Sequence, residues 1–249
     1  MVLMVGPSNR NRILAVTEMR TFPTRTPPRN RLLVFARVPQ LGEVKSRLAV
    51  DLGTDKALRV YEAMLSDLLD SIGESSDDFE VEILWTGTDS VDRELLHRWF
   101  GSRPLARQAG ETLGDRLAVA FSERIFFHRT EKVVAIGTDD PCLSSDLLRA
   151  AFGLLDSCEW VIGPAHDGGY YLIGCRGSSF EANAFRDIDW GTNSVFASTV
   201  EKIRLSKATL GVLPRRRDID LTEDLRASCD EIPTTHRLGS LLKEWGWIG

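Results

Sequence analysis

The sequence predicts an α/β fold in which a mostly parallel central sheet is flanked by helices on both faces. Two observations support this prediction. From residue 31 onward, short apolar runs typical of strands alternate with longer segments whose apolar residues recur at helical spacing. In addition, the loops that follow the strand patterns are polar and contain glycine or proline, as expected where parallel strands end at a ligand-binding edge.

Seven segments have the short apolar or alternating pattern of β-strands. Lys132–Ile136 is the strongest candidate for a central strand, because all of its residues after Lys132 are apolar. Residues 160–163 and 170–174 are separated by the turn His166-Asp-Gly-Gly169, which is typical of a hairpin. The expected strands are residues 32–35, 80–85, 104–107, 132–136, 160–163, 170–174 and 209–213.

Amphipathic helical patterns fill the intervals between these strands. The longest runs from Thr54, a candidate N-cap, to about Ile72. Thr112 and either Ser144 or Ser145 are candidate N-caps of two more helices. Further helices are expected around residues 95–100 and 192–203, with two short ones near the C-terminus.

The composition argues against several classes of protein. The 249 residues are 43% hydrophobic and 27% charged with a formal net charge of −5, so the basic face of a nucleic-acid binder is not expected. The apolar runs are too short to cross a membrane. The four cysteines form no C-x-x-C pair, which favours free thiols over a zinc site or disulfides, and we expect a cytoplasmic protein.

Residues 1–29 differ from the rest of the chain. They contain four prolines and five arginines but a single acidic residue, and they show no sustained periodicity. We therefore expect a disordered N-terminal extension. Residues 30–249 show no internal repeat and no clear linker, so we expect them to form a single domain.

The loop from Phe35 to Leu48 suits a polyphosphate group. Gly42 allows close backbone approach, while Lys45 and Arg47 offset phosphate charge. The spacing of a P-loop is absent, which disfavours a Walker-type NTPase. A surface loop whose charges are merely solvated is the alternative interpretation.

Acidic residues follow two of the later strands. Asp139 and Asp140 end the strand 132–136 just before Pro141, and adjacent carboxylates there can bind Mg²⁺ or Mn²⁺ through one or two oxygens. The alternative is a simple turn before the proline. Asp218 and Asp220 have the alternation that lets both side chains point one way on an extended segment, so they are candidate metal or ribose contacts.

Two further segments contain candidate ligand contacts. In the turn after residue 163, Gly168 and Gly169 allow a ligand to approach the backbone, and Asp167 is free to bind a hydroxyl group. A plain hairpin turn is the alternative. The segment from Gln108 to Arg116 combines a short strand with a helix start that could help to bind an anion.

Together these segments resemble the bacterial GT-A-like glycosyltransferases associated with arsenosugar biosynthesis or radical-SAM proteins, within the nucleotide-diphospho-sugar transferase superfamily. The chain is also similar to the guanylyltransferases of molybdenum-cofactor and deazaflavin-cofactor synthesis. Arg37 stands where the family more often has lysine, and Gly191 stands where serine is usual. The matching motifs are P-x-x-G-x-V-K-[ST]-R-L from Pro39, Q-x-G-x-x-L-G-x-R from Gln108, G-[ST]-D-x-P from Gly137, G-P-A-x-D-G-G-Y-Y-L-I-G from Gly163, W-x-T from Trp190 and D-x-D-x-x-E-D-L from Asp218.

The resemblance implies a Rossmann-like GT-A fold with a nucleotide bound by the first loop and Mg²⁺ or Mn²⁺ held near Asp139. The first hypothesis is a metal-dependent glycosyltransferase that uses a nucleotide-diphosphate sugar and a small-molecule acceptor. The alternative is a nucleotidyltransferase that joins an NTP to a phosphorylated acceptor and releases pyrophosphate. A nucleotide-binding protein without turnover is a third possibility, and the oligomeric state, monomer or homodimer, is left open.

The expected site residues fall into four groups. The nucleotide contacts are Phe35, Ala36, Arg37, Gly42, Lys45, Arg47, Gln108, Gly110, Arg116 and Asp139. The acceptor or sugar contacts are Asp140, Pro141, Asp167, Gly168, Gly169 and Trp190. The metal ligands are Asp139, Asp218 and Asp220, and the catalytic side chains are Asp167, Lys45 and Arg47.

Overall fold

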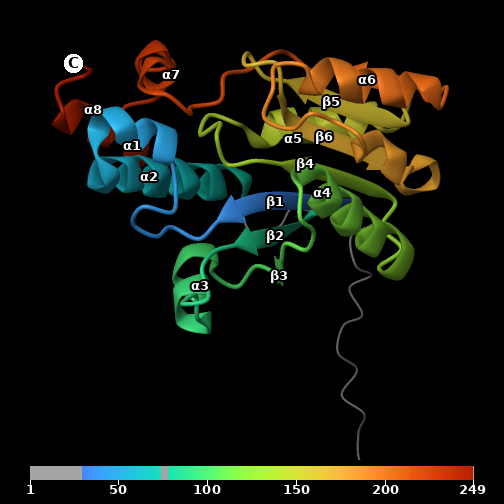
Figure 1. Ribbon diagram of the computed structural model, residues 1–249, viewed down its shortest axis with the longest axis horizontal. Helices are drawn as coiled ribbons and strands as arrows, with labels where there is room; N and C mark the ends of the chain where they lie inside the picture. The colour runs from blue at the N-terminus through green and yellow to red at the C-terminus, as the bar shows by residue number, and fades with distance from the viewer. Residues whose placement is uncertain (1–29, 74–77, 249) are drawn as a thin grey trace, which may run out of the picture.

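A computed structural model describes residues 30–73 and 78–248 and shows an α/β fold with one seven-stranded sheet (Figure 1). The strand order is β3-β2-β1-β4-β6-β5-β7. All seven strands expected from the sequence are present. They are β1 (Asn30–Arg37), β2 (Glu80–Thr86), β3 (Leu105–Arg107), β4 (Lys132–Ile136), β5 (Trp160–Pro164), β6 (Tyr170–Arg176) and β7 (Leu210–Val212).

The sheet is parallel except at β6, which runs antiparallel to both of its neighbours, β4 and β5. The short connection between β5 and β6 explains this reversal, because parallel neighbours need a long crossover whereas a tight turn joins antiparallel ones. The carboxyl ends of the other strands therefore lie at one edge of the sheet, and the turn between β5 and β6 lies at that same edge.

Helices cover both faces of the sheet (Figure 1). One face packs against α2 (Thr54–Ile72), α3 (Arg93–Phe100) and α5 (Ser145–Leu154). The other face packs against α4 (Leu113–Ser122), the π-helix η1 (Glu123–Phe127), the 3₁₀ helix η3 (Ala182–Phe185) and α6 (Val195–Leu205). None of the described helices combines the length and the apolar character that crossing a lipid bilayer requires.

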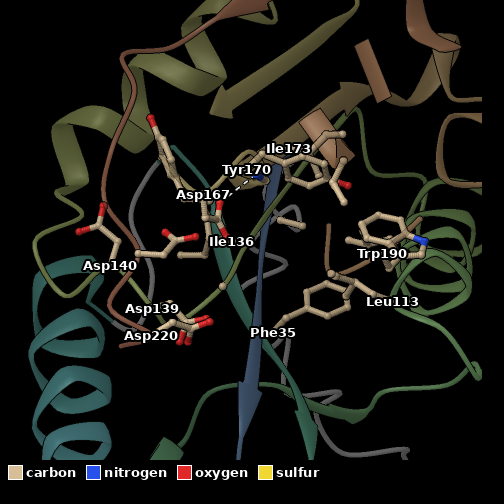
Figure 2. A pocket seen from close by; sticks show the side chains of 18 of the residues that line it. Phe35, Leu113, Ile136, Asp139, Asp140, Asp167, Tyr170, Ile173, Trp190 and Asp220 are labelled. Carbon is tan, nitrogen blue, oxygen red and sulfur yellow. Dashed lines mark hydrogen bonds between the residues drawn. The ribbon is translucent and has the colours of Figure 1, made fainter. Parts of the chain in front are cut away.

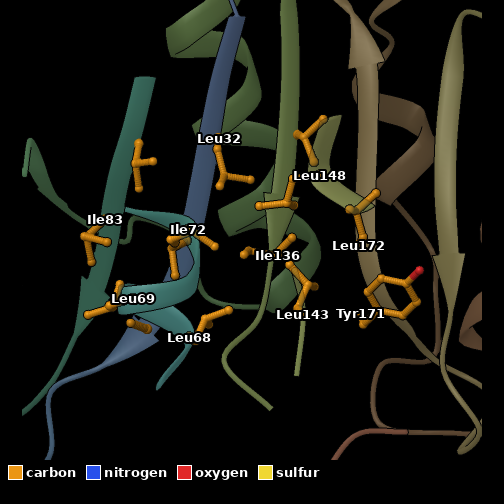
Figure 3. Packing of buried hydrophobic residues seen from close by; sticks show 14 of the residues in the cluster. Leu32, Leu68, Leu69, Ile72, Ile83, Ile136, Leu143, Leu148, Tyr171 and Leu172 are labelled. Atoms are coloured by element: carbon orange, nitrogen blue, oxygen red, sulfur yellow. The ribbon is translucent and has the colours of Figure 1, made fainter. Parts of the chain in front are cut away.

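Alternation along the strands divides the core into two clusters. On β1, Leu32 and Val34 face α2 while Leu33 faces α4. Figure 3 shows the first cluster, in which Leu32, Ile83, Ile136 and Leu172 from four strands meet side chains of α2 and α5. Because side chains alternate between the two faces of a strand, both layers bury apolar side chains along the same strands.

A third cluster joins the C-terminal helices to the outer side of α2. The helix α1 (Ser46–Leu52), α7 (Thr222–Ala227) and α8 (Arg237–Glu244) bury Leu48, Leu225 and Leu238 against Met64 of α2. The segment between β7 and α7 therefore crosses the carboxyl edge of the sheet on its way to this cluster.

The elements agree with the sequence prediction, with three differences. Thr54 is the first residue of α2 rather than its N-cap, which is Gly53. The loop after β1 ends earlier than expected, because the short helix α1 begins at Ser46. The helix expected from residue 192 begins at Val195, since Thr192 is held in a turn by bonds to Asp189 and Ser194. Thr112 and Ser144 cap α4 and α5 as expected. The disordered extension expected at 1–29 lies outside the described residues.

Candidate functional site

A cavity of about 400 Å³ lies at the carboxyl edge of the sheet (Figure 2). Its lining has two chemical sides. Carboxylates gather on one side, and aromatic and aliphatic side chains on the other. The acidic side holds Asp139, Asp140, Asp167, Asp218 and Asp220 with Arg47, and the apolar side holds Phe35, Leu113, Leu117, Tyr170, Ile173, Trp190 and Val195.

The end of β4 positions Asp139 at the centre of the acidic side. The Asp139 carbonyl accepts a hydrogen bond of 2.8 Å from the Ile219 backbone nitrogen, which ties the loop after β4 to the segment after β7. That contact brings Asp218 and Asp220 to the same cavity as Asp139. The prediction that Asp218 and Asp220 point one way agrees with their shared place in the lining.

Lys45 lies beneath the acidic side rather than in the cavity. Its ammonium Nζ donates to Asp139 Oδ1 and to the Ile219 carbonyl, both at 2.5 Å, and to Asp220 Oδ1 at 3.1 Å. The side chain is only 4% exposed. Burial lowers the pKa of Lys45, but the two carboxylates outweigh it and raise the pKa above its ordinary value.

The backbone of Lys45 is strained. It adopts φ 48° and ψ 43°, the left-handed region that non-glycine residues seldom occupy. Such strain is commonly stored at functional sites, where the surrounding contacts hold it in place. Lys45 holds the carboxylates in position and offsets their charge, and the direct contact with a diphosphate expected from the sequence stays a prediction.

Arg47 is the cation that lines the cavity itself among the described residues. It lies on α1, is 69% exposed, and its Nη1 is 3.6 Å from Asp220 Oδ2. Arg47 and Asp139 thus share one cavity, as their expected joint contact with a pyrophosphate requires. Because the pair with Asp220 is long and open to solvent, Arg47 can turn toward a bound anion at little cost.

Asp218 is the most perturbed carboxylate of the cavity. Its Oδ1 is buried and has no hydrogen-bond partner. Burial, reinforced by the nearby carboxylates of Asp139, Asp167 and Asp140, raises the pKa of Asp218 to about 8. A cation bound beside Asp218 would offset the cost of burying its charged carboxylate and would reduce the repulsion from the neighbouring carboxylates.

Asp140 is engaged by a different partner. Its carboxylate pairs with Arg216, which donates from Nε to Oδ2 and from Nη2 to Oδ1, and Oδ1 also accepts from the Cys142 backbone at 3.0 Å. Pro141 lines a smaller pocket on the far side of this pair. Asp140 therefore lines the cavity while it is held by Arg216, and Pro141 lies outside the cavity lining. Their expected contacts with the acceptor stay predictions.

The β5–β6 turn aims Asp167 into the cavity. Its Oδ1 accepts from the Gly169 backbone at 2.8 Å. Gly168 has φ +93°, and a side chain there would bring its Cβ within 2.2 Å of the Asn193 carbonyl. Gly168 is thus needed for the turn and for its close contact with the residues before α6, and Gly169 lines the cavity.

Several expected nucleotide contacts lie outside the cavity lining. Gln108 donates from Nε2 to the carbonyls of Leu84 at 2.7 Å and Ala36 at 3.4 Å, so it joins the ends of the strands. The Arg116 Nε donates to the Gly110 carbonyl at 3.1 Å. The residues concerned, Ala36, Arg37, Gly42, Gln108, Gly110 and Arg116, are absent from the cavity lining.

Sequence reasoning missed the aliphatic and tyrosine part of the apolar side. Leu113 is 44% exposed although it begins α4, and Tyr170 stacks edge-on against Trp190 with ring centroids 6.2 Å apart. One signal was present: Gly114 weakens the first turn of α4, and a Cβ there would lie 2.7 Å from Trp190 Nε1. A glycine in a helix start can therefore mark a packed aromatic neighbour.

The residues fit a divalent cation held by few protein ligands. In the described ranges, no three His, Cys, Asp or Glu side chains form a preassembled metal centre; the Lys45 ammonium instead bridges Asp139 and Asp220. Asp218, whose buried oxygen lacks a partner, and Asp139 could hold Mg²⁺ through one or two carboxylates. Water and substrate phosphates usually complete such a site.

A mostly parallel sheet with such a cavity at its carboxyl edge defines a Rossmann-like protein. The DUF2064 family, described as an uncharacterized protein conserved in bacteria, matches residues 73–192. A Desulfovibrio desulfuricans G20 protein, described provisionally as a nucleotide-diphospho-sugar transferase, is 32% identical with a TM-score of 0.81 over 87% of this chain and 95% of that chain. The chain therefore belongs to the same family as this Desulfovibrio protein and has the Rossmann-like fold of nucleotide-diphospho-sugar transferases.

More distant structures share the fold alone. The 4-diphosphocytidyl-2C-methyl-D-erythritol synthase of Anaerococcus prevotii DSM 20548 is 12% identical, with a TM-score of 0.51 over 78% of this chain and 94% of that chain. The bifunctional IspDF of Campylobacter jejuni is 9% identical, with a TM-score of 0.52 over 79% of this chain and 53% of that chain. A search of curated proteins found no significant match.

Proposed function

We propose that this protein is a metal-dependent glycosyltransferase that moves a sugar from a nucleotide-diphosphate donor to a small-molecule acceptor. The observation that supports this most is the joint presence of Arg47, Asp139 and Asp218 in one cavity. A cation and carboxylates at the carboxyl edge of a parallel sheet suit a diphosphate bound together with a divalent metal. The assignment of the Desulfovibrio relative agrees with this chemistry.

Charge stabilisation is the main task of the site in this proposal. As an acceptor hydroxyl oxygen bonds to the anomeric carbon, the bond from that carbon to the diphosphate oxygen breaks and negative charge grows on the leaving diphosphate. Arg47, which is exposed and weakly paired, turns onto that charge. Lys45 holds Asp139 and Asp220 in place from below, so the acidic side keeps its geometry during the reaction.

Asp139 and Asp218 would hold Mg²⁺ or Mn²⁺, which supplies further positive charge to the diphosphate when bound. Asp167 lies on the same side and binds the acceptor or sugar hydroxyl, and its carboxylate is the candidate to receive the acceptor proton. Trp190 and Leu113 on the opposite side offer apolar contact to the ring of a bound sugar, nucleobase or acceptor.

A nucleotidyltransferase is the second candidate, and the shared fold of the Anaerococcus synthase favours it. In that reaction an acceptor phosphate oxygen attacks the α-phosphorus of an NTP, and the bond to the β-phosphate breaks to release pyrophosphate. The same cation and carboxylates would stabilise charge on the phosphorus oxygens. The two reactions differ in what leaves, namely a nucleoside diphosphate or pyrophosphate.

One experiment separates the two candidates. The protein is incubated with Mn²⁺ or Mg²⁺ and a panel of nucleotide sugars and NTPs, with and without phosphorylated and hydroxylated acceptors. We expect nucleoside diphosphate from a nucleotide sugar, and none once Asp139 is replaced by asparagine. Pyrophosphate release that requires a phosphorylated acceptor would overturn the glycosyl assignment, while nucleotide binding without either product would indicate a protein without turnover.

A further inference from the structure

A second pocket, of about 120 Å³, lies on the other side of Asp140 from the large cavity. Three consecutive arginines, Arg215, Arg216 and Arg217, line it together with His166. Because one water occupies about 30 Å³ in the liquid, the pocket has room for a group the size of a phosphate. None of its basic residues is used by the reaction proposed above.

The chain between β7 and α7 places acids and bases on different sides. Residues 215, 216, 217 and 219 line the small pocket, whereas residues 218 and 220 line the large cavity, so the two sides alternate from 217 to 220. This is the alternation of an extended segment. Two backbone hydrogen bonds hold the segment beside the end of β5. The Arg216 nitrogen donates to the Pro164 carbonyl, and the His166 nitrogen donates to the Arg216 carbonyl, both at 3.0 Å.

The charges of the small pocket favour an anion. Three arginines and two acidic residues, Asp140 and Glu231, line the pocket, so its lining has one more guanidinium group than carboxylates. Asp140 is already paired with Arg216. Arg217 lies 3.9 Å from Asp224, and in the described part of the chain no carboxylate lies within ion-pair distance of Arg215.

The pocket is also partly built before a ligand arrives. Arg216 is fixed by Asp140 and by a bond of 3.1 Å from Nη2 to the Cys142 carbonyl. The side chain of Asp140, 6% exposed, stands between the pocket and the large cavity. A guanidinium held in place loses less conformational entropy when it binds an anion than a free one does.

We infer that this pocket is a binding site for a phosphate group, with Arg215 and Arg217 as its mobile cations and Arg216 as its fixed one. The site is separate from the diphosphate site proposed at Arg47 and Asp139. Its ligand is either free inorganic phosphate or the phosphate of a small organic monoester. The inference stands on the pocket alone and does not require the transferase reaction.

Histidine NMR locates the site directly, since the chain has four histidines. Inorganic phosphate is titrated into the full-length protein in EDTA, with the ring signal of His166 assigned through His166→Gln. EDTA removes divalent cations, so the acidic cavity repels the anion. We expect a saturable shift of the His166 signal. No shift, or equal shifts of His97 and His128, would overturn the inference.

Two matched arginine variants test whether phosphate binds in the small pocket or in the large cavity. Arg215→Ala should weaken phosphate binding about fivefold or more, which is the loss of one exposed charge contact, while Arg47→Ala in the large cavity should leave it unchanged. Both positions are exposed, so both variants should unfold at the wild-type temperature. Equal loss in the two variants, or no loss in Arg215→Ala, contradicts the assignment.

A parallel titration with glycerol phosphate distinguishes the two sources of the ligand. Binding at least as tight as that of inorganic phosphate indicates that the pocket takes the phosphate of a larger molecule. Binding of inorganic phosphate alone indicates a site for the free anion. Failure of both titrations rejects the pocket while leaving the transferase proposal intact, because that proposal depends on product formation at the other cavity.

Discussion

The large cavity and the small pocket share a wall but have opposite charge. The large cavity gathers five carboxylates around one lining cation, Arg47, while the small pocket gathers three arginines around two carboxylates. The Asp140–Arg216 pair stands between them, since Asp140 lines both regions and Arg216 lines the small pocket. Neighbouring sites of opposite sign can therefore coexist when a fixed ion pair separates them, because the pair neutralises itself at the boundary.

The largest expected effect comes from neutralising the centre of the acidic side. Asp139→Asn should lower the rate of product formation about 100-fold or more, the scale of losing a main electrostatic contact in a transferase site. The rate is measured as nucleoside diphosphate or pyrophosphate released per minute.

The matched control for this change is Asp89→Asn. Its carboxylate is fully exposed and lies outside the cavity lining, so activity should be unchanged. Full activity in Asp139→Asn, with turnover shown for the wild type, would falsify the role given to the acidic side.

The next largest effect is expected from removing the Asp140–Arg216 ion pair that separates the large cavity from the small pocket. Arg216→Met leaves the Asp140 carboxylate, 6% exposed, without its cation. We expect the free energy of unfolding to fall by about 3 kcal/mol, as is common when one partner of a buried pair is removed. Urea unfolding measures the change.

The double variant Arg216→Met with Asp140→Asn serves as the control. It should recover part of the stability, because the uncompensated buried charge is gone. A single variant as stable as the wild type would mean that the pair does not separate the two regions energetically.

The raised pKa of Asp218 should make the stability of the protein depend on pH. The pKa of Asp218 is about 8 in the folded protein against an ordinary 3.8, so the folded state keeps a proton that the unfolded state has released. Stability should therefore fall as the pH rises between about 4 and 8, by up to about 1.4 kcal/mol per pH unit.

Urea unfolding in EDTA at pH 5, 6, 7 and 8 tests this dependence. The Asp218→Asn variant should show a flatter profile than the wild type, since asparagine carries no titrating proton. Added Mn²⁺ should stabilise the wild type most at the highest pH, where it replaces the lost proton. Parallel profiles for wild type and variant would refute the assignment of the shift to Asp218.

The smallest expected effect concerns the exposed arginine of the small pocket. Arg215→Ala should change the free energy of unfolding by less than about 0.5 kcal/mol, the usual range for a surface residue away from buried networks. Comparing the stability of Arg215→Ala with that of Arg216→Met separates an arginine that binds the ligand from one that supports the fold. Calorimetric unfolding suffices, and a loss above 2 kcal/mol would show that Arg215 supports the fold.

The sequence was a good guide to what depends on local pattern. The seven strands, the caps at Thr112 and Ser144, and the place of Asp139 at the end of a central strand all follow from hydrophobic period and turn chemistry. The antiparallel direction of β6 also follows from the short turn before it.

The contacts of Lys45 and Arg216 could not be derived in that way. The Lys45 ammonium reaches the Ile219 carbonyl across 174 residues, and Arg216 reaches Asp140 across 76. No periodic signal relates positions so far apart, so Lys45 was expected to face the ligand. Local pattern thus identified which residues gather at the edge of the sheet, but not which of them neutralise one another there.

The alternating segment from Arg217 to Asp220 makes the charge of both regions depend on its register. Deleting one residue just before it would turn each side chain to the opposite face, as a one-residue slip does in any extended strand. Arg217 would then face the acidic cavity, and Asp218 and Asp220 would face the basic pocket. The fold itself could survive such a deletion while the two neighbouring binding sites exchanged their preferences.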